Sequence, residues 1–212
     1  MERKTSTSTG NTMLKRDRRV PPGVLDSARR TICNKRFGEI VTWDKYGYET
    51  NGAEAVATAS CLPGGGPPLH YHTTYAERFQ PIDGDLSVML GDGAKQTHIV
   101  VKPGEAVDVP IGAKHRFFNE SDKEVKFRGW VLPAHAGFEQ SLYILYGLNN
   151  DGLGDPKTGL PSSLLHTAVV ANLGDMRFPG LAGGMTNYFV KILAWYARWT
   201  GVEEELLKKY WD

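Results

Sequence analysis

The chain has 212 residues, with a hydrophobic fraction of 41% and a charged fraction of 23%, which are ordinary values for a soluble globular protein. This length suggests one domain, or one domain with an appendage. The net charge is only +1. No run of about 18 consecutive apolar residues occurs, so we expect no membrane span.

Residues 1–36 are basic, with 10 Lys or Arg against 3 Asp or Glu. Such a segment could contact nucleic acid or an anionic surface, but no aromatic residue lies among its charges before Phe37. We therefore expect a flexible N-terminal arm and no nucleic-acid partner. Its first residues contain no apolar segment, so a secretory signal is not expected.

Cys33 and Cys61 are the only two cysteines. Two cysteines cannot form a disulfide framework or a zinc ribbon, and we expect free thiols. Free thiols indicate a reducing compartment, and hence a cytoplasmic location.

Residues 37–134 consist of short runs typical of β-strands, separated by turn signals. The runs are GEIVTW, AEAVATASCL, LHYHT, RFQPI, DLSVML, QTHIVV, EAVDVP, KHRFFN and VKFRGWVL. Asp83-Gly84 is typical of a two-residue hairpin turn, because both residues tolerate positive φ. Many short strands at such regular spacing predict an all-β sandwich or barrel.

Residues 135–212 have a different character, with apolar periodicity over lengths typical of helices. Residues 185–200 place Tyr188, Ile192, Trp195, Tyr196 and Trp199 on one broad face of a helix. That face could lie on a membrane surface, but its polar side has few Lys or Arg, so we expect it to pack on the barrel or on a partner subunit. The exposed strand edges and this face together predict a homodimer.

The first chemical motif lies in LHYHTTYAERF, residues 69–79. His70 and His72 are two apart on a predicted strand, so both side chains leave the same face. Glu77 follows a short turn, from which a returning strand would bring it beside them. Two imidazoles and a carboxylate suit a divalent metal, although exposed strand histidines would explain the spacing equally well.

A second motif lies in GEAVDVPIGAKHRFFN, residues 104–119. With it, the chain resembles the cupin superfamily. The first cupin motif is matched by Gly64, His70, His72, Glu77 and Gly84, and the second by Gly104, Pro110, Gly112, His115 and Asn119. The resemblance covers residues 40–134 and neither the N-terminal arm nor the C-terminal helices.

The resemblance implies a mainly β fold, a double-stranded β-helix or cupin jelly-roll barrel, followed here by C-terminal α-helices. It also implies that His70, His72, Glu77 and His115 bind one divalent transition-metal ion per chain. Three imidazoles and a carboxylate suit Fe, Mn, Ni, Cu or Zn and leave coordination positions open. We expect turn geometry from the motif glycines, and a strand end bonded to backbone from Asn119.

Other residues are assigned from their place along the strands. Phe79, Phe117 and Trp130 are expected to line a substrate pocket, although core packing would explain them nearly as well. His98 is expected on a strand, at the surface or in the core, and His166 in a helix, while His135 could lie at the mouth of the barrel.

Three functions remain open for such a chain, because cupins include enzymes and binding modules. The first is a mononuclear metal-dependent oxidoreductase, of the dioxygenase type, acting on a small organic molecule, with Glu77 as a catalytic proton acceptor. The second is a non-redox isomerase or lyase, and the third is a non-catalytic module that binds a small molecule. No helix-turn-helix segment supports a sensor.

Overall fold

The computed structural model describes residues 17–212, and the strands in this part form two antiparallel sheets. The larger sheet has the strand order β1-β2-β3-β9-β4-β7, and the smaller sheet has the order β6-β5-β8. The strands are β1 (Thr31–Asn34), β2 (Glu39–Lys45), β3 (Ala55–Cys61), β4 (Ala76–Asp83), β5 (Leu86–Leu90), β6 (Thr97–Val101), β7 (Val107–Val109), β8 (His115–Phe118) and β9 (Val125–Leu132). The fold is mainly β with C-terminal helices, as predicted.

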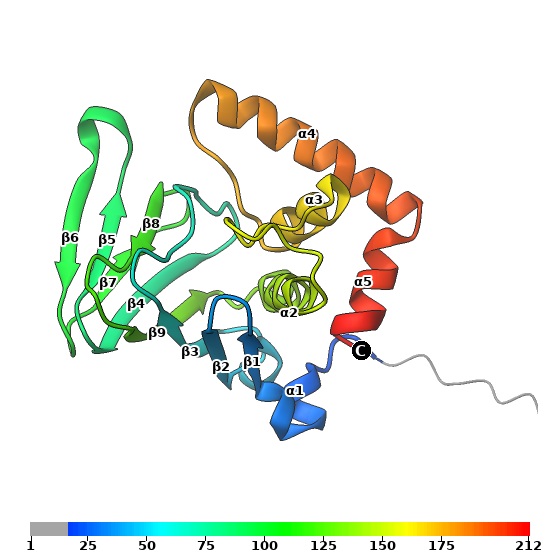
Figure 1. Cartoon of the computed structure of the whole chain (residues 1–212), viewed down its shortest axis with the longest axis horizontal. Helices are drawn as coiled ribbons and strands as arrows, with labels where there is room; N and C mark the ends of the chain where they lie inside the picture. Colours follow the sequence, from blue (N-terminus) through cyan, green and yellow to red (C-terminus); the bar gives the residue numbers. More distant parts are fainter. Residues whose placement is uncertain (1–16) are drawn as a thin grey trace, which may run out of the picture.

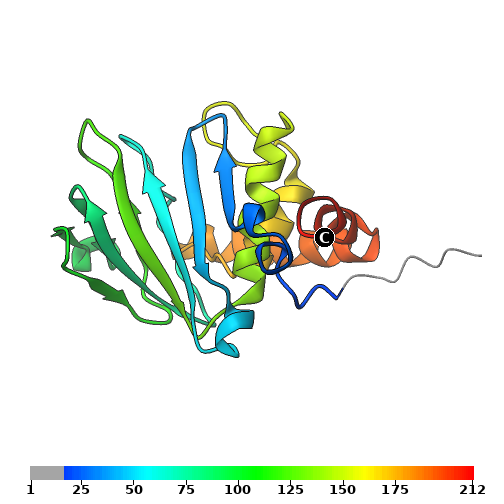
Figure 2. The same cartoon turned by 90° about the horizontal axis from the view of Figure 1, so that it is seen from below.

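Five α-helices occur in the same residues, four of them after the last strand. They are α1 (Pro22–Leu25), α2 (Ala136–Asn150), α3 (Leu164–Leu173), α4 (Gly180–Trp199) and α5 (Val202–Tyr210). Figures 1 and 2 show the two sheets at one end of the molecule and helices α2 to α5 together at the other. None of the described helices combines the length and the apolar character needed to cross a membrane.

Alternation along the strands decides which face of the larger sheet is buried. In β9, Val125, Phe127 and Val131 are buried, whereas Lys126 on the opposite face is exposed. Val131 is the register partner of Glu77 on β4, so Glu77 lies on the buried face as well. One face of this sheet therefore holds both the core and the candidate metal ligand.

Two hydrophobic clusters share that face. The first lies between the two sheets and includes Phe79, Leu86, Val88 and Phe127. The second lies between the β1–β3 end of the larger sheet and the helices, and includes Trp43, Ile144 and Trp211. The helical extension is therefore packed on the same sheet that carries the site.

Residues 17–34, which were predicted to belong to a flexible arm, are part of the folded structure. Strand β1 pairs with β2, and Arg18 forms an ion pair with Asp212 at 2.9 Å. Strand pairing supplies backbone hydrogen bonds that a solvated arm would lack, so the sheet begins before residue 37. The remainder of the predicted arm, residues 1–16, lies outside the described residues.

The predicted strand at residues 69–73 is also different in the structure. It is an extended segment with two isolated bridges, His70 to His115 and Tyr71 to Arg177. Glycines before it allow a close approach: Gly66 has φ +126°, and a Cβ there would lie 2.2 Å from the carbonyl oxygen of Phe117. Only glycine suits that position, so the glycine-rich turn serves to seat this segment against β8.

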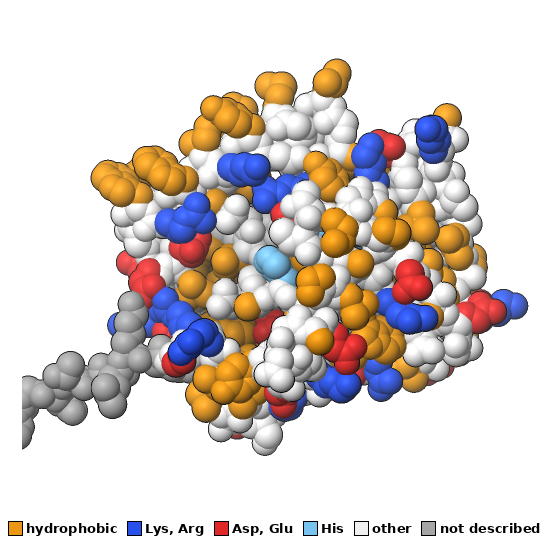
Figure 3. Space-filling view, turned by 180° about the vertical axis from the view of Figure 1, so that it is seen from behind, with side chains coloured by type: hydrophobic (Ala, Val, Ile, Leu, Met, Phe, Trp, Pro, Cys, Tyr) orange, Lys and Arg blue, Asp and Glu red, His pale blue; other side chains and the backbone are white. Residues whose placement is uncertain are grey.

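The predicted aromatic face of residues 185–200 lies on α4, which runs along one edge of the molecule. Its inner side packs through Val190, Ala194 and Ala197, which are buried. Its outer side does not fold back on the barrel: hydrophobic side chains gather along this edge in the space-filling view (Figure 3).

Candidate metal centre

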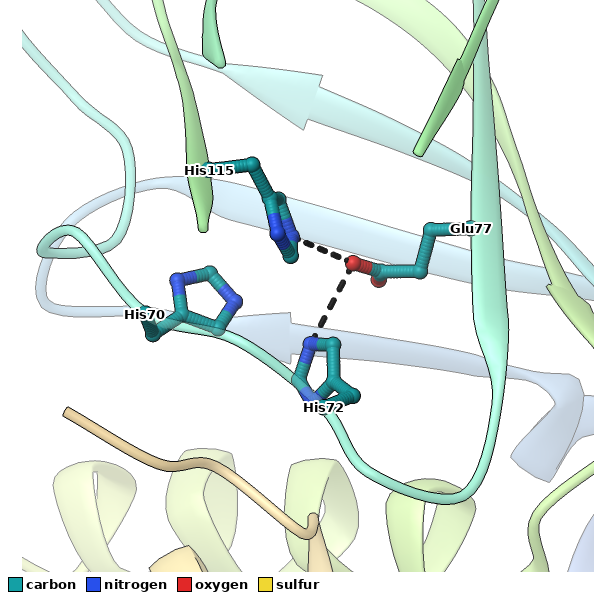
Figure 4. Close-up of side chains that lie close together, drawn as sticks. All are labelled: His70, His72, Glu77 and His115. Atoms are coloured by element: carbon teal, nitrogen blue, oxygen red, sulfur yellow. Dashed lines mark hydrogen bonds and ion pairs between the residues drawn. The ribbon is translucent and has the colours of Figure 1, made fainter. Parts of the chain in front are cut away.

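The four predicted ligands come from three neighbouring pieces of backbone (Figure 4). His70 and His115 form an antiparallel backbone pair, with N–H···O distances of 3.0 and 2.8 Å. Residues directly opposite in such a pair project from the same side, which places the two imidazoles together. Gly112 donates its N–H to the carbonyl of His72 at 2.8 Å, so the turn of the second motif holds the first motif in place.

The cluster is compact and enclosed. One ligand atom from each of His70, His72, Glu77 and His115 lies within 4.8 Å of the others. Their side chains are buried, with exposed fractions of 1% to 7%. The structure therefore brings together all four residues that were predicted to bind a metal, and this buried group could bind one ion.

The hydrogen bonds of the imidazole rings determine which nitrogen faces the cluster. Each Nδ1 lies beside a backbone carbonyl: His70 with Pro68 at 2.8 Å, His115 with Ala113 at 2.9 Å, and His72 with Asp175 at 3.2 Å. A carbonyl accepts only, so each Nδ1 is the protonated nitrogen. The three Nε2 atoms then present lone pairs to the cluster, which is the form that binds metal.

The residues fit a metal ion by a second criterion. Nε2 of His72 is buried and makes no hydrogen bond, although it lies 3.2 Å from Oε2 of Glu77. Oε2 of Glu77 is also 2.7 Å from Nε2 of His115. Buried polar atoms are costly without partners, and a cation placed among these atoms would satisfy all of them.

The pKa shifts of these groups differ in direction. Burial, with the neighbouring His115 and His72, lowers the pKa of His70 to about 4, so this ring is neutral at pH 7. Burial alone would raise the pKa of Glu77, but its contacts with His115 and His72 outweigh burial and lower that pKa. Burial would likewise lower the pKa of His115, yet the hydrogen bond to Glu77 raises it. The contact with Glu77 therefore favours the protonated form of His115, and a divalent cation bound here would displace that proton.

Asp175 supports the site from the helical extension, and the sequence motifs did not predict it. Its carbonyl accepts from Nδ1 of His72, and its carboxylate accepts from the backbone N–H of Thr73 at 2.6 Å and the hydroxyl of Thr74 at 2.9 Å. Asp175 has φ +47°, a conformation that Asp and Asn tolerate better than most residues. The only sequence signal for this role of Asp175 was the Gly174-Asp175 pair between two helical segments.

The second link from the extension runs through Tyr75. Its ring stacks on His72 with centroids 4.3 Å apart, and its hydroxyl donates to the carbonyl of Gly174 at 2.7 Å. Next along the chain, Tyr71 and Arg177 exchange two backbone hydrogen bonds at 2.9 and 3.0 Å. Residues 174–177 therefore form a strap that is bonded to the loop between the ligands His70 and Glu77.

Two of the three aromatic residues predicted to line a pocket lie near the cluster. Phe79 is buried with its ring 6.3 Å from that of His115, and Phe117 packs on Phe79 with centroids 5.2 Å apart. Trp130 does not line the site: it is the register partner of Arg78, one residue away from the inward pair of Glu77 and Val131, so it faces outward.

The three other histidines lie outside the cluster. His98 is paired with Glu120 at 3.0 Å on the surface, as expected, and half-buried His166 lies in α3. His135 is the N-cap of α2, where Nδ1 accepts from the backbone N–H of Phe138 at 3.1 Å. Asn119 donates to the carbonyl of Cys61 at 2.8 Å, which is the backbone role expected for it.

Two facing antiparallel sheets enclose a buried cluster of three histidines and one glutamate that could bind a metal ion. Residues 58–132 match the family model described as a cupin domain. These residues therefore form a cupin domain, and the fold is the double-stranded β-helix that the resemblance implied.

Solved structures with partial similarity have diverse descriptions. One is an oxalate oxidase in complex with the substrate analogue glycolate, at 25% identity over 45% of this chain and 51% of that chain, with a TM-score of 0.39. Another is a sugar phosphate isomerase of Silicibacter pomeroyi, at 21% identity over 47% and 62%, with a TM-score of 0.39. A third is the capsular polysaccharide assembling protein CapF of Staphylococcus aureus, at 21% over 44% and 26%, with a TM-score of 0.38. No curated protein matches the chain.

This chain spans about half the length of the oxalate oxidase. The similarities extend over less than half of this chain, and such low TM-scores do not distinguish one cupin activity from another.

Proposed function

We propose that the protein is a mononuclear metal-dependent oxidoreductase of the dioxygenase type that acts on a small organic molecule. The observation that supports this most directly is the convergence of three imidazoles and one carboxylate within 4.8 Å in a buried cluster. A structural zinc site is commonly closed by four ligands that include cysteines. A set of three histidines and one glutamate suits a larger coordination sphere with positions left for other ligands.

His70, His72, Glu77 and His115 would hold the ion, which when bound would supply a Lewis-acidic, redox-capable centre with room for substrate. The chain supplies the rest. The carbonyls of Pro68, Asp175 and Ala113 keep the rings oriented. Glu77 is the only carboxylate in the cluster, and we assign it the role of proton acceptor toward the substrate.

The surroundings support an apolar or aromatic substrate fragment. Tyr75 and Phe79 are both buried against histidines of the cluster and would exclude water from the reacting groups. The small exposed fraction of the four ligands supports a small substrate.

The cluster offers less to a proton-shuttling isomerase or lyase, since such enzymes use a separate acid and base. Among the described residues, the cluster contains a single carboxylate, which is itself a predicted ligand. This observation favours the oxidoreductase over the non-redox alternative.

Elemental analysis of the purified protein, followed by oxygen uptake with a panel of small organic acids and phenols, tests the proposal. We expect one transition-metal ion per chain and oxygen consumption that depends on both metal and substrate. Metal-replete protein that converts a panel member without consuming oxygen would instead identify a non-redox enzyme. Protein that binds panel members without converting them would identify a binding module.

We further propose a cytoplasmic homodimer. Cys33 and Cys61 are not disulfide-bonded, which supports a reducing compartment. The uncovered aromatic face of α4 supports a second copy of the chain as partner.

A further inference from the structure

The outer face of α4 carries a stripe of large apolar side chains that no described part of the chain covers. We call six of them the α4 stripe: Leu181, Met185, Tyr188, Ile192, Trp195 and Trp199. Their exposed fractions range from 42% for Ile192 to 96% for Leu181. Phe189 and Tyr196 widen the stripe on one side and are 55% and 43% exposed. Single exposed apolar residues are common, but a continuous patch of this kind marks an interaction site.

The spacing of the stripe is that of a helix-to-helix seam. Successive members are separated by four, three, four, three and four residues, the pattern with which one helix faces another. The opposite side of α4 is already used, because Gly183, Val190, Ala194 and Ala197 are buried there. The helix therefore has an inner face for its own chain and an outer face suited to a second helix.

The stripe is symmetric about its centre, near position 190. If a second α4 lay antiparallel across a two-fold axis, Leu181 would meet the partner's Trp199 and Met185 would meet the partner's Trp195. The central pair would be Tyr188 with the partner's Ile192. Each aromatic ring would then face a smaller side chain, which gives even packing, whereas a parallel pair would stack tryptophan on tryptophan.

The area of the stripe is sufficient for a stable dimer. Aromatic side chains present about 150 to 250 Å² each, so the exposed parts of the five aromatic residues and three aliphatic ones amount to roughly 800 Å². A standard specific interface buries about 800 Å² per partner.

The charges around the stripe favour protein over lipid as the occupant. Lys191 and Arg198 are the only basic residues of α4, and Arg198 lies 3.8 Å from Glu203. The next helix, α5, begins with Glu203, Glu204 and Glu205. A helix that binds anionic membranes has a basic polar face, and this region lacks one.

We infer that the α4 stripe is the two-fold interface at which two copies of the chain pair, with their α4 helices antiparallel. This inference rests on the homodimer proposed above, and it is independent of the proposed activity because no residue of the α4 stripe belongs to the metal cluster.

Sedimentation velocity of the full chain at about 1 to 50 µM tests the pairing. Wild type is expected to be a dimer. Ile192→Glu places an unpaired charge at the centre of the stripe and is expected to raise the dimer Kd at least about 100-fold. Val100→Glu is the matched control, because Val100 is 48% exposed on β6 and lies outside the stripe; it should remain dimeric.

Circular dichroism and metal content identify a variant that has simply misfolded, and Trp195→Ser then serves as the second disruptive change. A wild-type monomer at 50 µM (a concentration about 50 times a micromolar Kd) overturns the inference. So does an Ile192→Glu dimer, or a Val100→Glu monomer. Wild-type monomer that floats with phosphatidylcholine or phosphatidylserine vesicles would assign the stripe to lipid instead.

Spin labels at a Leu181→Cys substitution, in a Cys33→Ser background, test the orientation. Antiparallel helices centred near residue 190 place the two labelled positions about 27 Å apart along the axis, from a rise of about 1.5 Å per residue. A parallel pair would place them at about the interaxial distance, roughly 10 Å, and would overturn the pairing described.

Discussion

The barrel and the helical extension contribute to the metal cluster in different ways. The barrel supplies all four candidate ligands, and it orients His70 and His115 through carbonyls only two residues away in the chain. The extension supplies no ligand, but Asp175 orients His72 from 103 residues away. The candidate ligands therefore come from one region, whereas one of the groups that orient them comes from a distant part of the chain. Substitutions in the two regions should have different effects on metal binding.

The largest effect is expected from a ligand within the barrel. His72→Ala removes one of four converging side chains and should weaken metal binding by more than about 100-fold, the upper end of what outer-shell changes cost. Turnover should be lost, while the barrel keeps its own core and stays folded. Isothermal titration with metal and far-ultraviolet circular dichroism measure the two effects. His98→Ala, at the surface, is the control; unchanged metal affinity in His72→Ala would contradict the ligand assignment.

The next effect separates the two faces of the larger sheet. Phe79→Ala removes a buried ring beside His115 and should lower the free energy of unfolding by about 3 to 5 kcal/mol. Trp130→Ala, on the outward face, should cost about 1 kcal/mol and leave metal affinity unchanged. Urea denaturation gives both values. Equal losses, or weaker metal binding in Trp130→Ala, would show that Trp130 belongs to the site.

A third effect tests the contact between the two regions through pH. Glu139 on α2 accepts from the backbone N–H of Gly47 at 2.8 Å, and burial raises its pKa from 4.5 to about 7. Between those pH values the folded protein binds more protons than the unfolded chain. The stability that Glu139 contributes is therefore fully present below about pH 4.5 and is lost as the pH rises to 7. The loss can reach about 3 kcal/mol.

Glu139→Gln keeps the acceptor and removes the charge, so the variant should be more stable than wild type at pH 8 and should lack this part of the pH dependence. Thermal or urea unfolding from pH 4 to 8 measures the difference between the two proteins. Glu124→Gln, an exposed carboxylate before β9, is the control. Parallel stability curves for Glu139→Gln and wild type would mean that Glu139 is ionised in the folded protein.

The smallest effect is expected from the strap. Asp175→Asn tolerates the same backbone conformation but weakens the charge-assisted bonds to Thr73 and Thr74, and should reduce metal affinity by about 10- to 100-fold. Asp155→Asn is the matched control, because Asp155 caps an exposed turn of the same extension with bonds to Lys157 and Thr158. Equal metal affinities in the two variants would show that the extension does not support the cluster.

These differences also explain how far the sequence could predict the structure. The spacing of His70, His72 and Glu77 indicated a possible metal site but left exposed strand histidines equally open, and the resemblance to the cupin motifs supplied the full set with His115. Alternation along β4 placed Phe79 on the same face as Glu77. Trp130 is adjacent to the inward-facing Val131 in β9, so alternation places Trp130 on the outward face. The role of Asp175 depends on where two helices return the chain, and no local pattern encodes that contact. The early start of the sheet was missed because pairing of β1 with β2 outweighs the basic character of the segment.

The long reach from Asp175 to His72 has a consequence for the order of assembly. Rings held by carbonyls two residues away can be oriented as soon as the barrel closes, but His72 is oriented only after the strap docks. Metal binding and docking of residues 174–177 are then thermodynamically linked, and each should favour the other by the same free energy. Amide hydrogen exchange in the strap, a segment with no ligand of its own, should therefore slow when metal is added to the barrel.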